Sequence, residues 1–200
     1  TNLSDEIEIK EGVTIESSAF SKTNISKVTI GNNITLPIGS FDNCPKLENI
    51  IIGDNVTIQA KAWSTPSFSS CSDIKNVTMG NNIKMNNTDT DTRNDRFAPF
   101  YKSNVERMTV ESLSEIGMLA FYNVGPALQG DIVINEGVTT IGAGAFNGCS
   151  NITSASIPST VTEIGNSSFC NCTNLKTAKL PEAVKKINWR SILQLYKFVR

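Results

Sequence analysis

The sequence predicts a β-rich solenoid, a stack of about eight short coils that bury their apolar edges against one another. The first observation behind this prediction is a recurring phenylalanine. A short apolar pattern accompanies each copy, and the distance between successive copies is similar wherever nothing is inserted. The phenylalanine follows a small residue or proline at Ala19-Phe20, Ser40-Phe41, Ser67-Phe68, Pro99-Phe100, Ala120-Phe121, Ala145-Phe146 and Ser168-Phe169.

Each copy contains one short strand. Two apolar residues flank a single outward residue, which is the period-two pattern of a strand with one buried face. A turn signal such as Gly31-Asn32-Asn33 follows, and then another apolar residue. We therefore expect one short parallel strand per coil, with short loops or turns elsewhere. The apolar pairs are Ile7/Ile9, Val28/Ile30, Ile50/Ile52, Val77/Met79, Met108/Val110, Ile132/Ile134, Ala155/Ile157 and Ala178/Leu180.

The spacing of the copies indicates the kind of solenoid. The period is 21 to 25 residues wherever nothing is inserted, inside the 20 to 29 residues typical of leucine-rich repeats. The last apolar residue of a coil follows the post-turn apolar residue at +2 in the first half of the chain and at +3 in the second. Cysteine occupies the third position after phenylalanine at Cys44, Cys71, Cys149 and Cys172.

The segment from Ile141 to Val184 resembles the BspA-like leucine-rich repeats, whose copies read roughly I-G-x-x-A-F-x-x-C-x-x-L-x-x-I-x-I-P-x-x-V-x-x-I. It reads IGAGAFNGCSNITSASIPSTVTEIGNSSFCNCTNLKTAKLPEAV and matches over nearly two copies, and the likeness extends more loosely from Ile7 to Ile187. The resemblance implies a surface or secreted protein of a host-associated microbe, with a role in adhesion to host proteins or other cells.

Two insertions interrupt the solenoid, which we place at residues 1–187. They lie near residues 59–67 and 86–99, at the same point of adjacent coils. We expect them to form a joint rim in which Trp63, Arg93, Arg96 and Phe97, residue types enriched at binding hot spots, contact a ligand. The alternative is two tolerated surface loops, with Trp63 and Phe97 folded back onto the stack. We expect residues 188–200 to form a C-terminal cap or a truncated last repeat.

The sequence offers few groups for catalysis. It has no histidine, which removes the commonest general base and the usual nucleophilic pairs. We expect the four repeated cysteines to line the core as free thiols and Cys170 to face outward. The run from Asn86 to Asp95 alternates carboxylates like a calcium loop, but Asn94 and Phe100 stand where that loop requires Gly and Glu. We therefore expect no enzymatic activity, no cofactor and no metal.

The outward residues of the strands form a second candidate surface. Two rows on the sheet are mostly neutral and rich in hydroxyl groups, which suits contact with protein or glycan. The alternative is an ordinary solvated sheet face. We expect ligand contacts from Asn49, Asn76, Thr78, Arg107 and Thr109.

The charge and hydropathy of the chain exclude two classes of partner. The net charge is −1, from 18 basic and 19 acidic residues, and no basic cluster appears, so nucleic acid is not expected. No apolar run approaches the ~20 residues that span a bilayer, so no membrane insertion is expected in this stretch.

These observations favour a non-enzymatic, extracellular module of a cell-surface or secreted protein that binds protein or mediates adhesion. Its partner would be a host or neighbouring-cell protein or a glycan, and we expect a monomeric domain. The adhesive role comes from the family resemblance, because a fold by itself does not fix a function. The alternative is a structural spacer, a solenoid that presents other domains and has no ligand of its own.

Overall fold

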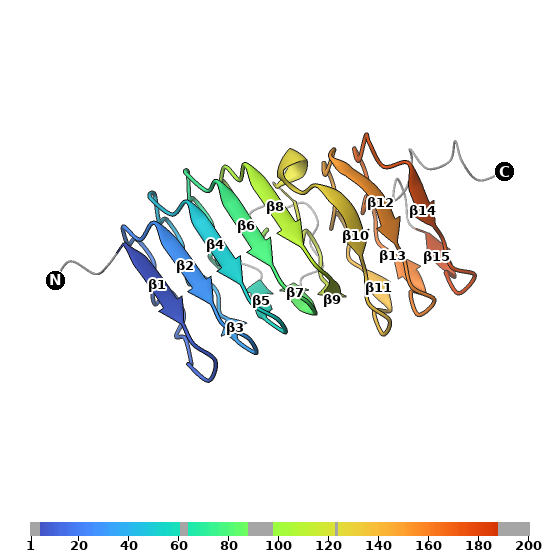
Figure 1. The fold of residues 1–200 in the computed structure, drawn as a ribbon. Coiled ribbons are helices and arrows are strands. Elements are labelled where there is room, and N and C mark those ends of the chain that lie inside the picture. Colours follow the sequence, from blue (N-terminus) through green and yellow to red (C-terminus); the bar gives the residue numbers. More distant parts are fainter. Residues whose placement is uncertain (1–4, 61–63, 88–97, 123, 188–200) are drawn as a thin grey trace.

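The computed structural model describes residues 5–60, 64–87, 98–122 and 124–187. Within these residues the chain winds into a solenoid of parallel strands (Figure 1). Eight strands lie on one face and a seven-stranded sheet lies on the other, so the solenoid makes about seven full turns, close to the eight expected. The solenoid prediction is confirmed.

The strands expected from the apolar pairs form the first face. Five of them make one parallel sheet in the order β1-β2-β4-β6-β8, which we call the first sheet, and three more make a separate parallel sheet in the order β10-β12-β14. The bounds of the first set are β1 (Glu6–Ile9), β2 (Lys27–Ile30), β4 (Asn49–Ile52), β6 (Asn76–Met79) and β8 (Arg107–Val110). The others are β10 (Gly130–Val133), β12 (Ile152–Ser156) and β14 (Thr177–Lys179).

Among the described residues, every coil after that of β1 also carries a second strand, where the sequence had predicted only a turn and a closing apolar residue. These strands form one continuous parallel sheet, here called the second sheet. Four of its strands are only two residues long, so a period-two pattern could not be recognised in them. The bounds are β3 (Thr35–Leu36), β5 (Thr57–Ala60), β7 (Ile83–Asn87), β9 (Leu113–Ile116), β11 (Thr140–Ile141), β13 (Glu163–Ile164) and β15 (Lys186–Ile187).

The repeated phenylalanines stack on one another inside the solenoid. Ring centroids lie 5.1 Å apart for Phe20 and Phe41, 5.4 Å for Phe41 and Phe68, and 5.1 Å for Phe68 and Phe100, with nearly parallel planes. Phe121, Phe146 and Phe169 form a second stack with spacings of 5.2 and 5.1 Å. These distances match the spacing of neighbouring strands, so each ring packs on its own copy in the next coil.

In most coils the residue three places after the phenylalanine ties neighbouring coils together. The Sγ atoms of Cys44, Cys71 and Cys172 each donate a hydrogen bond to the carbonyl oxygen of the phenylalanine one coil earlier, over 3.1 Å. Ser103 takes the same position in its coil, and its Oγ donates to the Phe68 carbonyl. The position therefore needs a small side chain that carries a donor, which explains its repeated cysteines.

Asparagine side chains connect the turns that follow the first-sheet strands. Asn33, Asn55 and Asn82 all have positive φ, between 57° and 59°, a conformation that asparagine tolerates better than most residues. The Asn55 amide nitrogen donates to Asn33 Oδ1 over 3.1 Å, and the Asn82 amide nitrogen donates to Asn55 Oδ1 over 3.1 Å. The asparagine thus adopts the positive φ of the turn, and its side chain also forms hydrogen bonds with the equivalent asparagines of the neighbouring coils.

The first face is interrupted between β8 and β10. A short 3₁₀ helix, η2 (Gly125–Ala127), lies on the connection between β9 and β10, and only isolated bridges join the chain there, Met108 to Leu128 and Leu113 to Ile134. The second sheet runs through this region without a break. The solenoid therefore has a longer N-terminal part and a shorter C-terminal part that share one sheet.

Replacing Phe68 by alanine tests the ring stack. Phe68 is fully buried between two other rings, so its truncation is expected to lower the free energy of unfolding by about 3–5 kcal/mol, as measured by urea denaturation. Phe20 is only partly buried, and Phe20→Ala serves as the control with a smaller loss. If both variants lose the same unfolding free energy, a ring buried between two other rings contributes no more stability than the partly buried Phe20 ring.

Replacing Asn55 tests the asparagine ladder. Asn55→Ala should cost about 2 kcal/mol of unfolding free energy, because it removes the ladder bonds and places a Cβ-bearing residue without a polar side chain in the left-handed region. Asn55→Gly keeps that backbone conformation without strain and should cost less in the same denaturation experiment. If the two variants are equally destabilised, backbone strain plays no part.

Candidate ligand-binding face

The first sheet brings together the five residues predicted to bind ligand there. Asn49, Asn76 and Arg107 are register partners in one outward row, because β4 pairs with β6 and β6 with β8 without a shift. Thr78 and Thr109 are register partners in the next outward row. All five side chains lie on the outer surface of three neighbouring strands, and we call the outward residues of the first sheet the first-sheet face.

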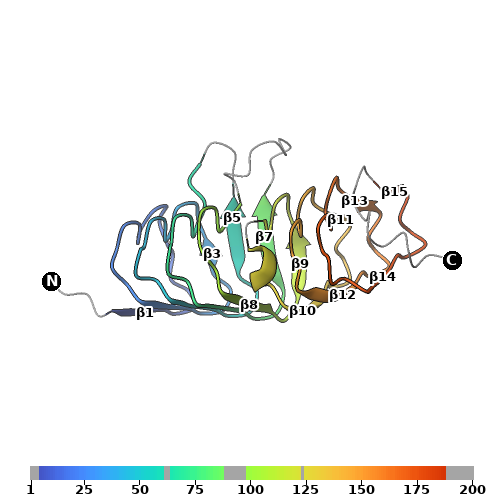
Figure 2. The ribbon, with the colours of Figure 1, turned by 90° about the horizontal axis from the view of Figure 1, so that it is seen from above.

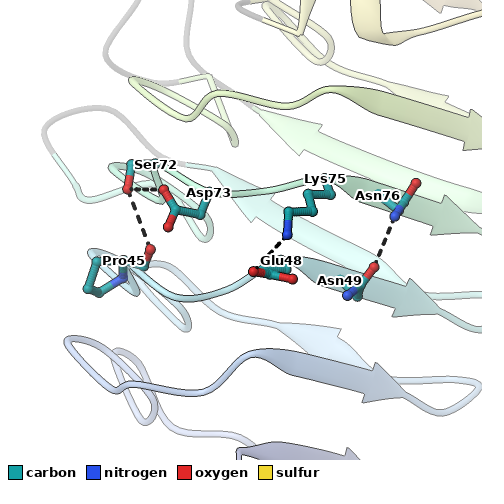
Figure 3. A network of polar contacts seen from close by, with 7 residues as sticks. All are labelled: Pro45, Glu48, Asn49, Ser72, Asp73, Lys75 and Asn76. Atoms are coloured by element: carbon teal, nitrogen blue, oxygen red, sulfur yellow. Dashed lines mark hydrogen bonds and ion pairs between the residues drawn. The ribbon is translucent and has the colours of Figure 1, made fainter.

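The middle of this face is held by side-chain contacts between β4 and β6 (Figure 3). The Asn76 amide nitrogen donates to Asn49 Oδ1 over 3.0 Å, and Lys75 Nζ lies 2.9 Å from Glu48 Oε1. Both contacts join residues at equal register positions of adjacent coils. The side chains therefore form ordered rungs across the face, which limits the conformational entropy that a ligand would have to remove on binding.

Ile51 is the residue on this face that sequence reasoning did not select. Its side chain is 41% exposed between Thr29 and Thr78, its register partners on β2 and β6. A large exposed aliphatic group is the typical centre of a protein contact, with hydrogen-bonding groups around it. The pair Ile50/Ile52 predicted that Ile51 points outward, which is confirmed, but an aliphatic residue was not selected among the expected ligand contacts.

The charged residues of the face alternate in sign from coil to coil. Lys27 on β2 pairs with Glu6 on β1 over 3.0 Å, and Lys75 pairs with Glu48. The hydrogen bond that Lys75 donates to Glu48, together with the negative charges of Glu48 and Glu106, holds the pKa of the Lys75 ammonium above its usual range. These pairs are exposed, and exposed ion pairs contribute little stability. Because each pair joins a positive and a negative side chain, the first-sheet face carries no large excess of either charge.

The C-terminal part of the first face repeats the arrangement with other residues. Asp131 accepts hydrogen bonds from Thr153 Oγ1 over 2.8 Å and from Ser154 Oγ over 2.6 Å, and these two bonds lower the pKa of its carboxyl group. Val133 is 44% exposed and lies beside Ser156. An exposed aliphatic residue beside hydroxyl groups thus occurs on both parts of the face.

The proposed rim residues Trp63, Arg93, Arg96 and Phe97 lie outside the described residues. The strand residues just before the two insertions are described. Ala60 on β5 is the register partner of Asn87 on β7, so the insertions leave adjacent strands as predicted. Both strands belong to the second sheet, on the other side of the coil from β1 and β8 (Figure 2). The rim and the first-sheet face are therefore separate candidate surfaces.

A small apolar cluster packs at the root of the second insertion. Ala98, the first described residue after it, is fully buried together with Met118 and Leu119, and Tyr122 and Ala143 pack against this cluster. Leu119 adopts a positive φ of 57°, which is unfavourable for a bulky residue. Burial of its side chain offsets that strain and fixes where the insertion rejoins the solenoid.

The four repeated cysteines are buried and unpaired, as predicted, while Cys170 is half-buried. Burial raises the pKa of the Cys172 thiol to about 12 and that of Cys149 well above its ordinary value. The neighbouring Cys44 thiol and burial together raise the pKa of Cys71. Cys71, Cys149 and Cys172 therefore act as neutral core hydrogen-bond donors and are poor nucleophiles, whereas the hydrogen bond with the Cys71 thiol lowers the pKa of Cys44.

The described residues hold no group of three or more cysteine, aspartate or glutamate side chains arranged around a possible metal ion. In the same part of the chain, no helix has the length and apolar character needed to cross a bilayer.

A thiol titration checks the assignment of the cysteines. The folded protein should react with Ellman's reagent at one thiol per chain, Cys170, and at five thiols in guanidinium chloride. Cys170→Ser should abolish the fast reaction and leave the denatured count at four. Rapid modification of two or more thiols in the folded protein would contradict burial of the cysteine ladder.

Comparison with known proteins agrees with the repeat geometry. No curated protein matches the chain, and no solved structure matches it. A family model does match: the BspA type leucine-rich repeat region, with six copies over residues 1–90 and 96–197. The match includes the coils that carry the phenylalanine stacks, the donor position and both sheets, and it covers nearly the whole sequence. The chain belongs to the family of BspA type leucine-rich-repeat proteins.

Proposed function

We propose that this chain is a non-enzymatic module of a cell-surface or secreted protein, and that it binds a protein partner through the first-sheet face. One observation carries the proposal: Ile51 is exposed at the centre of an ordered surface, with Asn49 and Asn76 in the adjacent row and Thr78 and Thr109 along its own row. Repeat solenoids commonly use such extended faces for binding.

The chemistry of the face favours protein over a strongly charged ligand. Its amide and hydroxyl groups offer both donors and acceptors, and the ion pairs at Lys27 and Lys75 balance acidic neighbours. An aliphatic centre with a polar surround is the usual anatomy of a protein interface. Adhesion to host or neighbouring cells is the biological role that we propose for this binding, since it is the role associated with the family.

The size of the face sets a limit on the contact. Five strands at ~4.8 Å spacing and four residues at ~3.3 Å each give a surface of about 24 Å by 13 Å, or roughly 300 Å². A stable protein interface takes about 800 Å² from each partner. We therefore propose that a partner also contacts the adjoining turns. There Ser72 Oγ donates hydrogen bonds to Asp73 Oδ1 and to the Pro45 carbonyl oxygen (Figure 3).

Substitution on the face tests this proposal. The chain should bind saturably to at least one protein in an array of purified extracellular-matrix proteins and glycans. Ile51→Lys and Thr78→Lys should each weaken that binding by about tenfold or more, which is the loss expected at the centre of an interface. Thr35→Lys makes the same chemical change at an exposed position of the second sheet and should leave binding unchanged.

Three other outcomes decide between the alternatives. Binding that survives both face substitutions, but is lost when Trp63, Arg93, Arg96 and Phe97 are replaced by alanine, would move the site to the insertions. Binding to glycans and to no protein would contradict a protein partner. A folded chain that binds nothing in the array would favour the spacer and count against this proposal.

A further inference from the structure

The coil contacts that repeat elsewhere along the solenoid are missing at one place. Within each part, a phenylalanine N–H donates to the carbonyl of the residue just before the next phenylalanine, as from Phe68 to Pro99 over 2.9 Å and from Phe121 to Ala145 over 2.7 Å. Among the described residues, neither this bond nor ring stacking joins Phe100 to the turn that contains Phe121. We call this boundary, between the coil of β8 and the coil of β10, the seam.

The donor that links coils elsewhere is also absent at the seam. Three residues after Phe121 stands Val124, which is buried but has no S–H or O–H group. The Phe100 carbonyl oxygen instead accepts a hydrogen bond from Ser103 N of its own turn, over 3.0 Å. At every later step of the stack a cysteine provides the link, since Cys149 and Cys172 donate to Phe121 and Phe146.

The two parts of the first face are also out of register at the seam. Met108 bridges Leu128 rather than Ile132, its equivalent in the repeat, and Leu113 bridges Ile134. Strand β10 is therefore displaced along its own direction relative to β8. Val105 and Val110 remain only partly buried there, whereas Ile74 and Met79, their equivalents one coil earlier, are fully buried.

The second sheet is what holds the two parts together. Met85 on β7, Ile116 on β9 and Ile141 on β11 are consecutive register partners. Gly117 N donates to the Met85 carbonyl over 2.8 Å, and Gly142 N donates to the Ile116 carbonyl over 3.0 Å. Across the seam the second sheet therefore continues through the pair of Ile116 and Ile141, whereas the strands of the first face end in separate sheets joined by isolated bridges.

A change of coil geometry accounts for the seam. The extra residue of the later coils first appears in β9, where the pairing of Ile83 with Leu113 and of Lys84 with Glu115 contains a register shift. A second shift follows between Gly130 and Asp131 on β10. Two kinds of coil therefore meet at the seam, with one register shift in the second sheet on its N-terminal side and one in the first face on its C-terminal side.

We propose that the solenoid bends at the seam, with the second sheet as the hinge, so that the first-sheet face and the face of β10, β12 and β14 turn relative to each other. Bending about this line opens the side where isolated bridges join Met108 to Leu128 and Leu113 to Ile134, and it keeps the pairing of Ile116 with Ile141 in the second sheet. Hinges of this kind absorb motion in a few residues while the bodies on either side move as units. The inference does not depend on the proposed function.

Pulsed electron-spin distance measurements test the hinge. Nitroxide side chains introduced as genetically encoded residues leave the five cysteines in place. One pair, Thr78 and Lys179, spans the seam, and a second pair, Glu8 and Thr109, lies within the first sheet; both span four strand spacings on the same outward row. The seam pair should give a distance distribution about twice as broad as the control pair, because motions between bodies exceed those within a packed sheet.

Restoring the missing donor provides the decisive variant. Val124→Cys places a thiol at the repeated donor position and should narrow the distribution of the seam pair without changing the control pair. Val161→Cys makes the same change at another buried valine and should have no effect. Equal widths for the two pairs in the wild-type chain would overturn the proposal. So would a folded Val124→Cys protein whose seam pair stays as broad as in the wild type.

Discussion

The distance between successive coils is the constraint on which the rest of this structure depends. Parallel strands hydrogen-bond at ~4.8 Å, and the phenylalanine rings follow this spacing at 5.1–5.4 Å. Each side chain therefore meets its own equivalent in the next coil. Positions that can stack on themselves repeat the same residue, as with the phenylalanines and the asparagines of the turns.

Charged positions follow the same constraint, but there residues of opposite charge, and not identical residues, lie next to each other in adjacent coils. Like charges placed at strand spacing would repel each other, and the ion pairs of the structure join unlike charges in adjacent coils: Glu6 with Lys27, Glu48 with Lys75 and Glu163 with Lys186. In each pair the acidic residue lies in the earlier coil. The surface is therefore ordered by the same spacing as the core, which is why the first-sheet face presents aligned rows of side chains.

A stack of this kind is stabilised by contacts between nearest neighbours, so one weak boundary has local consequences. At the seam the ring stack, the donor ladder and the first sheet are all interrupted, and two valines that should be core residues are partly exposed. The asparagine of the following coil partly compensates, because Asn135 donates to Asn82 and lies 3.4 Å from Ser112 Oγ. Polar contacts at the turns thus join the two sides of this boundary in addition to the buried core, which continues across it through Met108 and Leu128.

The sequence predicted the features that repeat and missed those that depend on the fit between two coils. The phenylalanine marks, the strands at the apolar pairs and the buried cysteines were confirmed, because each position recurs and its environment is similar in most coils. The strand Thr35–Leu36 is too short to show a period. The seam was not predicted, although the change of closing distance and Val124 at the donor position were both visible. The placement of Asn49, Asn76, Thr78, Arg107 and Thr109 on one face follows from register alone, whereas their part in binding is a proposal.

Amide hydrogen exchange followed by mass spectrometry tests the central claim, that stability is set coil by coil through nearest-neighbour contacts. We expect two maxima of protection, one in the strands around residues 50–79 and one around residues 146–169, separated by a minimum over residues 105–130. Uniform protection across all these residues, lost in a single cooperative step, would contradict it.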